Sequence, residues 1–193
     1  MGPDLRTLNG LAFALPACAW GRPGRGRSLA SLILATLAIL VLSGCVLDKE
    51  AAVRAQLADW VLLGETRYFH STGECTAGVF ATGATQITSG VKRVQGVDRG
   101  LGLIRQGVAV AFDVTGMAPV DVYRALDSAD HSTALGILVS GLAARDCYGQ
   151  DMQDGFANVL NTAGVVLVFD PENKATALFD RAGKRIFYTR AEL

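Results

Sequence analysis

The feature that most constrains this chain is an uninterrupted apolar run near its N-terminus, at residues 29–42. Its 14 residues read LASLILATLAILVL and contain no charged side chain. Arg22, Arg25 and Arg27 precede it in a stretch rich in glycine, which does not hold a helix well. A basic flank followed by an apolar core of about 7–15 residues is typical of a secretory signal peptide. The run therefore predicts that the chain leaves the cytoplasm.

The residues that follow this run indicate the type of signal. Leu42-Ser43-Gly44-Cys45 resembles the lipobox of bacterial lipoprotein signal peptides, and the resemblance covers about residues 22–45. It implies that small residues let a peptidase approach the backbone and that the Cys45 thiolate accepts a diacylglyceryl group. Cleavage would remove residues 1–44 and leave Cys45 as the lipidated, N-acylated first residue of a domain spanning 45–193.

The length of this signal leaves two other readings open. Lipoprotein signals usually run to about 30 residues at most, and this one would have 44. A translation start further downstream, or a long n-region, accounts for the difference. Alternatively, residues 29–47 form an uncleaved membrane anchor, or a buried helix without a polar face.

The resemblance also implies a location. A lipoprotein cysteine carries two or three acyl chains, such as palmitate, and two chains are enough for stable anchoring. In Gram-negative sorting an aspartate directly after the cysteine favours the inner membrane, but residue 46 is a valine. We therefore expect the domain in the periplasm, on the inner leaflet of the outer membrane.

Charge and hydropathy exclude several classes of protein. The 18 Lys and Arg residues balance 18 Asp and Glu residues, which excludes a strongly basic nucleic-acid binder. Half of the residues are hydrophobic, too many for a disordered chain, and a single long apolar run excludes a polytopic membrane protein. Residues 45–193 contain 14 basic and 17 acidic side chains, a net charge of −3, and their length suits one domain.

The pattern of apolar residues predicts helices and strands in alternation. A first helix capped by Asp48 and stopped at Gly64 is followed by strands and by a weak helix interrupted by glycines. A long helical pattern follows, breaking near 128–130, with Leu135, Leu138 and Leu142 on one face. The expected strands are 67–70, 76–82 and 108–114, and the expected helices after the first are 84–107, 120–145 and 152–160.

The C-terminal segment is predicted to be a three-stranded antiparallel meander at 165–170, 175–180 and 185–190. Pro171 in the first connection indicates a type I turn, and Gly183 in the second suits a positive φ. Together these elements predict the α+β class: a mostly antiparallel sheet with helices packed on one face.

Two of the four cysteines, Cys75 and Cys147, are available to form a disulfide or a site within the domain, because Cys18 lies in the signal and Cys45 in the lipobox. In an oxidising compartment Cys75 and Cys147 are expected to form a disulfide. The rival interpretation is a zinc site that adds His70 and His131, although zinc ligands usually come in close pairs and these do not.

Signs of catalysis are weak. The sequence has no G-x-S-x-G elbow, and a Cys75–His131 dyad requires a free thiol. The basic residues Lys92, Arg93, Arg99 and Arg105 suit an anionic envelope polymer or lipid headgroups, but so few charges favour a solvated helix face.

Three functions follow in order of preference. The first is a non-enzymatic interaction or structural module on the membrane, with no cofactor beyond the lipid on Cys45, which meets another envelope protein or polymer. The second is a small-ligand-binding lipoprotein with a pocket between helix and sheet. The third is a metal-binding or hydrolytic module that uses His70 and His131.

Overall fold

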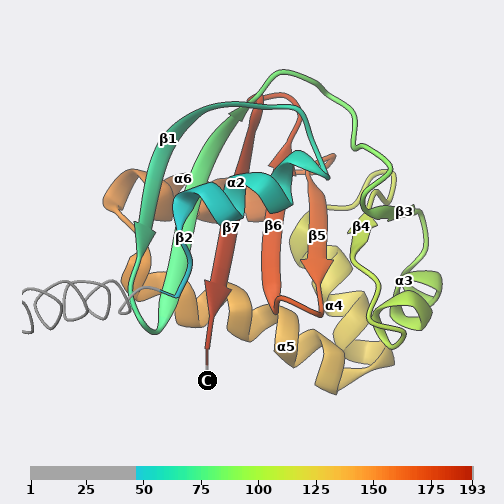
Figure 1. Ribbon diagram of the computed structural model, residues 1–193. Helices are drawn as coiled ribbons and strands as arrows, with labels where there is room; N and C mark the ends of the chain where they lie inside the picture. Colours follow the sequence, from blue (N-terminus) through green and yellow to red (C-terminus); the bar gives the residue numbers. More distant parts are fainter. Residues whose placement is uncertain (1–46, 193) are drawn as a thin grey trace, which may run out of the picture. The chain divides into compact units, whose positions relative to one another are not determined.

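A seven-stranded sheet organises residues 47–192, the part of the chain that this computed structural model describes. The strand order is β1-β2-β7-β6-β5-β4-β3, and only the β3–β4 pair is parallel (Figure 1). The elements are α2 (Glu50–Ala58), β1 (Leu63–Ser71), β2 (Cys75–Thr82), β3 (Lys92–Val94), α3 (Val97–Ile104), β4 (Val110–Phe112), α4 (Pro119–Ala129), α5 (His131–Leu142), the 3₁₀ helix η1 (Ala143–Cys147), α6 (Gln150–Leu160), β5 (Val166–Asp170), β6 (Ala175–Asp180) and β7 (Arg185–Ala191).

The predicted α+β class, the mostly antiparallel sheet and the C-terminal meander β5–β6–β7 are confirmed. These strands lie in the middle of the sheet, and nearly all of their side chains are buried. They contain Val, Leu, Phe and Ile at successive positions, which suits strands that are covered on both faces.

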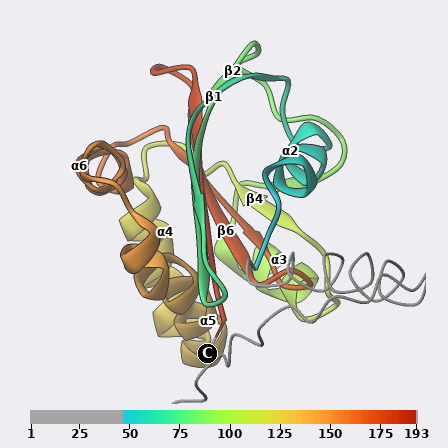
Figure 2. The same ribbon diagram turned by 60° about the vertical axis from the view of Figure 1, so that its left-hand side comes forward.

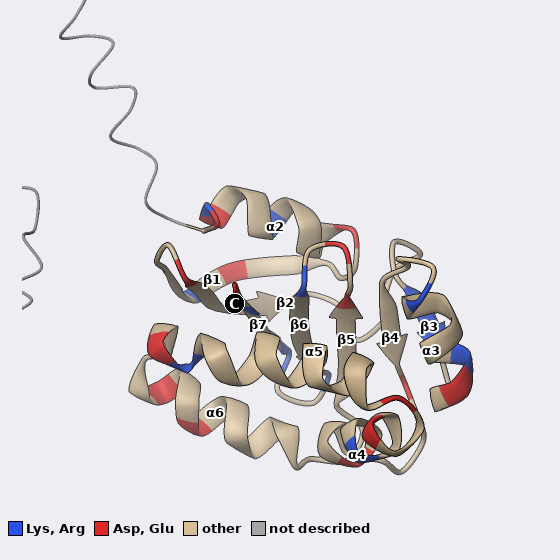
Figure 3. Cartoon of the chain, turned by 90° about the horizontal axis from the view of Figure 1, so that it is seen from below, with Lys and Arg blue, Asp and Glu red and all other residues tan. Residues whose placement is uncertain are grey.

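Helices cover both faces of the sheet, and this corrects the expectation that they pack on one face. α4, α5 and α6 lie on one face, whereas α2 crosses the other, as Figures 2 and 3 show. α2 buries Val53 and Leu57 beside Trp60 against the second core, which contains Phe179, Ile186 and Tyr188 among others. The central strands carry apolar residues on both of their faces, so a second covering layer is required.

The first helix also begins differently from the expectation. Asp48 does not cap α2, whose N-cap position is Lys49 and carries no side-chain cap bond. The Asp48 carboxylate instead contacts Arg190 of β7, with 2.7 Å between Oδ1 and Nη1. A long-range ion pair has replaced a local cap.

The weak helix predicted over 84–107 is largely wrong. The segment contains the edge strand β3 and only two turns of helix in α3. Gly100 lies within α3, and a Cβ atom at this position would collide with the Phe112 ring of β4. Glycine here permits close helix–sheet contact rather than interrupting a helix.

Each of the two meander turns follows an aspartate at the end of a strand, Asp170 in the first and Asp180 in the second. In the first, Asp170 Oδ1 accepts hydrogen bonds from the backbone N–H of Glu172 and of Asn173. In the second, the positive φ falls on Lys184 (φ 47°) and not on Gly183, contrary to expectation. Gly183 instead leaves room for the Asp180 carboxylate, because a Cβ atom there would overlap this side chain in its present position.

Candidate functional site

The N-terminal end of the described chain is fixed to one end of the sheet. The Leu47 N–H donates to Thr72 O at 2.5 Å, and the Asp48 N–H donates to Ser71 Oγ at 3.1 Å. Ser71 and Thr72 belong to the β1–β2 hairpin, which adjoins the C-terminal end of β7 (Figure 1). Cys45, the expected lipid-attachment residue, lies outside the described residues but precedes Leu47 by only two positions.

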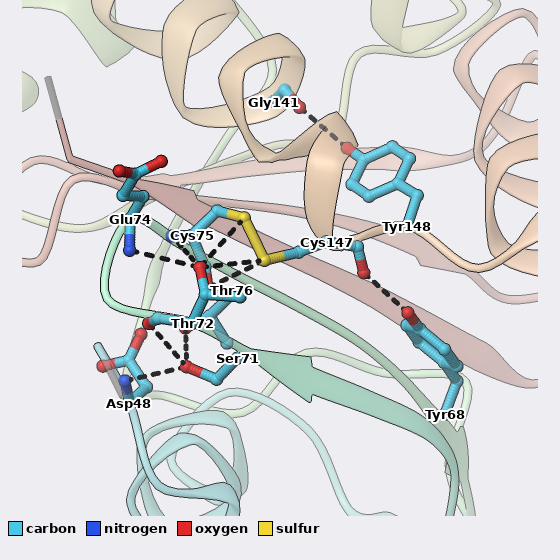
Figure 4. Close-up of a disulfide and its surroundings, with 10 residues drawn as sticks. All are labelled: Asp48, Tyr68, Ser71, Thr72, Glu74, Cys75, Thr76, Gly141, Cys147 and Tyr148. Carbon is cyan, nitrogen blue, oxygen red and sulfur yellow. Dashed lines mark hydrogen bonds between the residues drawn. A yellow bond between two sulfur atoms is a disulfide. The ribbon is translucent and has the colours of Figure 1, made fainter. Parts of the chain in front are cut away.

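A disulfide between Cys75 and Cys147 lies at this same end, as the sequence predicts. It joins the start of β2 to the end of η1, with 6.0 Å between the two Cα atoms (Figure 4). Thr72 Oγ1 lies 3.7 Å from Cys147 Sγ, so the bridge adjoins the hairpin that holds Leu47. The chain-entropy model assigns a loop of this length about 4 kcal/mol of stabilisation.

Two tyrosines hold η1 in place beside the disulfide. The Tyr68 hydroxyl donates to Cys147 O at 2.6 Å, and the Tyr148 hydroxyl donates to Gly141 O at 2.8 Å (Figure 4). Burial raises the pKa of Tyr148 well above its ordinary value, so its hydroxyl stays neutral and remains a donor. The C-terminal end of α5 is thereby fixed relative to β2.

A pocket of about 180 Å³ lies between the helices α4, α5 and α6 and the sheet. Only apolar atoms are exposed within it. Its floor is formed by Leu167 of β5 and by Thr176 and Leu178 of β6. The walls come from the three helices: Pro119, Val120, Tyr123, Ile137, Leu138, Gly141, Leu142, Phe156 and Leu160.

The position of α5 keeps this pocket open. Ser140 is buried and hydrogen-bonds to Thr176 of β6, while its hydroxyl also lies 2.8 Å from Ile137 O. These bonds hold the helix backbone close to the strand. The next residue, Gly141, has no side chain, and a Cβ atom there would approach only Phe156 Cζ, at 3.9 Å. The small residue therefore leaves free volume beside Phe156.

The pocket carries no charge at neutral pH. Its titratable lining residue is Tyr123, whose pKa is raised by burial and by the nearby Asp127 carboxylate. The Tyr123 phenol consequently stays neutral. A neutral site with apolar lining favours an uncharged apolar group over an anion or a cation.

The structure does not bring together the residues considered for metal binding or catalysis. His70 is exposed on β1, and His131 is exposed at the start of α5, where its Nδ1 lies 2.6 Å from Asp127 Oδ1. Both remaining candidates, Cys75 and Cys147, are joined to each other. Across residues 47–192, no three His, Cys, Asp or Glu side chains form a group that could hold a metal ion.

Comparison with known proteins gives no relative. No family model, no curated protein and no solved structure matches this chain. The candidate site consequently rests on its own geometry.

The four basic residues predicted to form a surface lie at the sheet edge formed by β3 and α3 (Figure 3). Two are engaged in ion pairs: Arg93 Nη1 lies 3.7 Å from Asp113 Oδ2, and Arg105 Nη2 lies 2.7 Å from Asp130 Oδ2. Lys92 and Arg99 are exposed, and no ion pair involves either within residues 47–192.

The sequence indicates a pocket between helix and sheet only in the second of the three functions, and it does not identify the lining residues. It placed Leu138 and Leu142 on one helix face, yet the partners of these leucines come from α4, α6 and the sheet, which are distant in the sequence. The usable signal is the pair Ser140-Gly141, two small residues inside an apolar helix.

None of the helices in the described residues is long and apolar enough to cross a membrane.

Proposed function

We propose that this protein is a lipid-anchored envelope lipoprotein whose domain, residues 45–193, acts as a non-enzymatic interaction module. The lipid is attached to Cys45, and the domain lies in the periplasm on the outer membrane. The lipobox supports this attachment, and the disulfide suits an oxidising compartment. Leu47 and Asp48 support it further, because their hydrogen bonds hold the chain against the domain almost directly after the anchor.

The pocket between α4, α5 and α6 is the observation that carries the function. Its volume is close to that of engineered apolar cavities of about 150 Å³, which bind molecules such as benzene. Pockets for drug-sized ligands usually measure at least about 300 Å³. We therefore propose that it receives one small apolar group, an aromatic ring or the end of an alkyl chain. The interaction module would then act by binding this apolar group in the pocket.

A photoreactive fatty acid with a diazirine near its methyl end tests this proposal. The lipidated protein in native membranes is illuminated with the probe, and the modified residues are located by mass spectrometry. We expect adducts on Phe156 and Leu160, which line the pocket interior from α6. Adducts scattered over the surface, with none on these residues, would contradict the proposal.

A pair of glycine variants provides the control for this experiment. Gly141→Leu places a side chain in the pocket, whereas Gly136→Leu changes the same helix at a position outside its lining. We expect the first variant to lose labelling of Phe156 and the second to retain it. Equal labelling in both variants would show that the probe does not enter the pocket.

A second partner is suggested by the basic edge. Lys92, Arg93 and Arg99 occur on β3 and α3, and two of the three have no strong ion pair in the described chain. An anionic envelope polymer could meet this edge. Binding of such a polymer that weakens with added salt, and weakens further in Lys92→Gln/Arg99→Gln, would support this interaction.

A further inference from the structure

The helix α5 has an apolar face that the domain does not cover. Leu135 and Leu142 are 46% and 50% exposed, and Leu138 and Val139 between them are half-buried. These four residues occur at positions i, i+3, i+4 and i+7, so they form one stripe along the helix. The opposite face of α5 is the one that packs on the core, through Ala134, Ile137, Ser140 and Gly141.

This stripe differs from an ordinary solvated helix face. Residues 131–144 contain no Asp, Glu, Lys or Arg. A surface helix usually carries charged residues opposite its buried face. Hollows also lie on both sides of the stripe: the apolar pocket beside Leu138 and Leu142, and a second hollow of about 320 Å³ beside Leu135 and Val139. An exposed apolar surface of this kind is typical of a site that contacts a membrane or another protein.

The attachment point of the anchor adjoins this helix. Leu47 bonds to Thr72, Thr72 lies against Cys147, and Cys147 ends the 3₁₀ helix η1 that directly continues α5. Cys45 precedes Leu47 by two residues, so covalent geometry keeps their Cα atoms within about 7 Å. The lipid chains are thus attached close to the C-terminal end of α5.

α5 also lies across the same end of the domain. Figures 1 and 2 show it beside the C-terminus and the β1–β2 hairpin. Ala191 confirms this placement, because it pairs with Cys75 in the sheet and lines the second hollow together with Leu135. A bilayer that contains the acyl chains of Cys45 therefore meets this end first.

We propose that the α5 stripe (Leu135, Leu138, Val139 and Leu142) rests on the phospholipid bilayer into which the Cys45 lipid is inserted. The leucines enter the boundary between headgroups and acyl chains, as in interfacial amphipathic helices. Lys174, exposed at the rim of the second hollow, reaches the headgroup phosphates. This orientation places the mouth of the apolar pocket, at Leu138 and Leu142, beside the membrane. The inference rests on the proposed anchoring at Cys45.

Labels at single positions test this orientation. An environment-sensitive fluorophore is attached to Leu135→Cys or Leu142→Cys in the lipidated protein, which is reconstituted into phosphatidylethanolamine–phosphatidylglycerol vesicles. Ala182→Cys is the matched control, because it is exposed in the β6–β7 loop at the opposite end of β7. We expect a blue shift and quenching by spin-labelled lipids at positions 135 and 142, with neither change at 182.

The outcomes separate this inference from the anchoring itself. Lipidated protein that fails to float with the vesicles would overturn the anchoring, and the orientation with it. Protein that floats but shows equal quenching at 135, 142 and 182 would leave the anchor intact and overturn the orientation. Fluorophore self-quenching at 135 that persists in detergent without vesicles would assign the stripe to a second copy of the chain instead.

Charge variants give an independent check on the same surface. Leu135→Glu/Leu142→Glu changes only exposed side chains, so the fold and the disulfide should be retained. Flotation through the lipid should persist, whereas a label at Val139→Cys should lose its lipid quenching. Unchanged quenching at position 139 in this variant would contradict the proposed contact.

Discussion

Arg190 and Asp48 join the last strand of the domain to the first residues after the expected anchor. The Nη1 atom of Arg190 lies 2.7 Å from Asp48 Oδ1, and the side chains are 21% and 11% exposed. Asp48 Oδ2 and Arg190 Nε have no other protein partner within the described residues. The pair is therefore largely excluded from water, and Asp48 depends on Arg190 for its charge. Arg190 has a second partner, because its Nη2 atom lies 3.2 Å from Oε1 of the exposed Glu192.

Breaking this pair should loosen the N-terminal segment. We expect Asp48→Asn to lower the free energy of unfolding by about 1–3 kcal/mol, because Arg190 then keeps only the exposed Glu192 carboxylate as a charged partner. Denaturant unfolding measures the loss, and a double-mutant cycle with Arg190→Met isolates the pair. Strict additivity of the two changes would show that they do not interact. Lys49→Gln is the control, because Lys49 is exposed in the same segment and forms no ion pair within residues 47–192.

The disulfide should be a major source of stability. Replacing Cys75 and Cys147 together with alanine removes the constraint on a loop of 72 residues, and we expect a loss of about 4 kcal/mol. Urea denaturation of the variant and the wild type measures this difference. An unchanged midpoint under non-reducing conditions would contradict the account.

Two helical glycines should respond in opposite ways to alanine. At Gly136 a Cβ atom meets only Phe169 Cζ, at 4.0 Å, so Gly136→Ala should raise stability by up to about 1 kcal/mol. At Gly100 the Cβ atom collides with Phe112, so Gly100→Ala should lower stability by about 1–3 kcal/mol. Thermal unfolding of both variants provides the comparison. Equal shifts in the same direction would show that the contact between α3 and β4 is not close.

Acid should weaken the contact between β4 and the β6–β7 loop. Arg181 donates two hydrogen bonds to Asp113, at 2.9 and 2.7 Å, and these bonds lower the pKa of the Asp113 carboxyl below its ordinary value of 3.8. A carboxyl whose pKa is lower in the folded state stabilises the fold above the unfolded pKa. That stabilisation is lost as the pH falls below about 4.

The Asp113→Asn variant tests this pH dependence. Its free energy of unfolding should fall less than that of the wild type between pH 5 and about pH 2.5, because it lacks the titrating group. Parallel stability curves for the two proteins over this range would exclude a contribution from the Arg181–Asp113 pair. Asp59→Asn is the control, since Asp59 is exposed.

The sequence predicts those parts of the fold that depend on neighbouring residues. The Pro171 turn and the largely apolar strands at 166–170 and 175–180 mark the meander, and the cysteine count identifies the disulfide. What it does not predict depends on distant partners. The local sequence indicates that Asp48 caps the first helix, but in the structure Asp48 pairs with Arg190. The sequence likewise indicates that Gly100 interrupts a helix, whereas in the structure it makes room for the Phe112 ring.

The candidate site shows the same division. Cys45 can be read from four adjacent residues, whereas the pocket combines three helices with two strands whose packing no local pattern specifies. Periodicity places the leucines of α5 on one face, but periodicity alone does not show whether that face points inward. Leu135 and Leu142 are exposed because smaller residues of α5, such as Ala134 and Gly141, occupy the buried face.

The central claim of this account is that the domain is held on a membrane through a lipid on Cys45. The intact mass of protein extracted from native membranes, alkylated with and without prior reduction, tests it most directly. We predict the mass of residues 45–193 plus two or three acyl chains, with alkylation of Cys75 and Cys147 only after reduction. An unlipidated mass that includes residues 1–44 would contradict the anchor and make residues 29–47 a membrane-inserted segment instead.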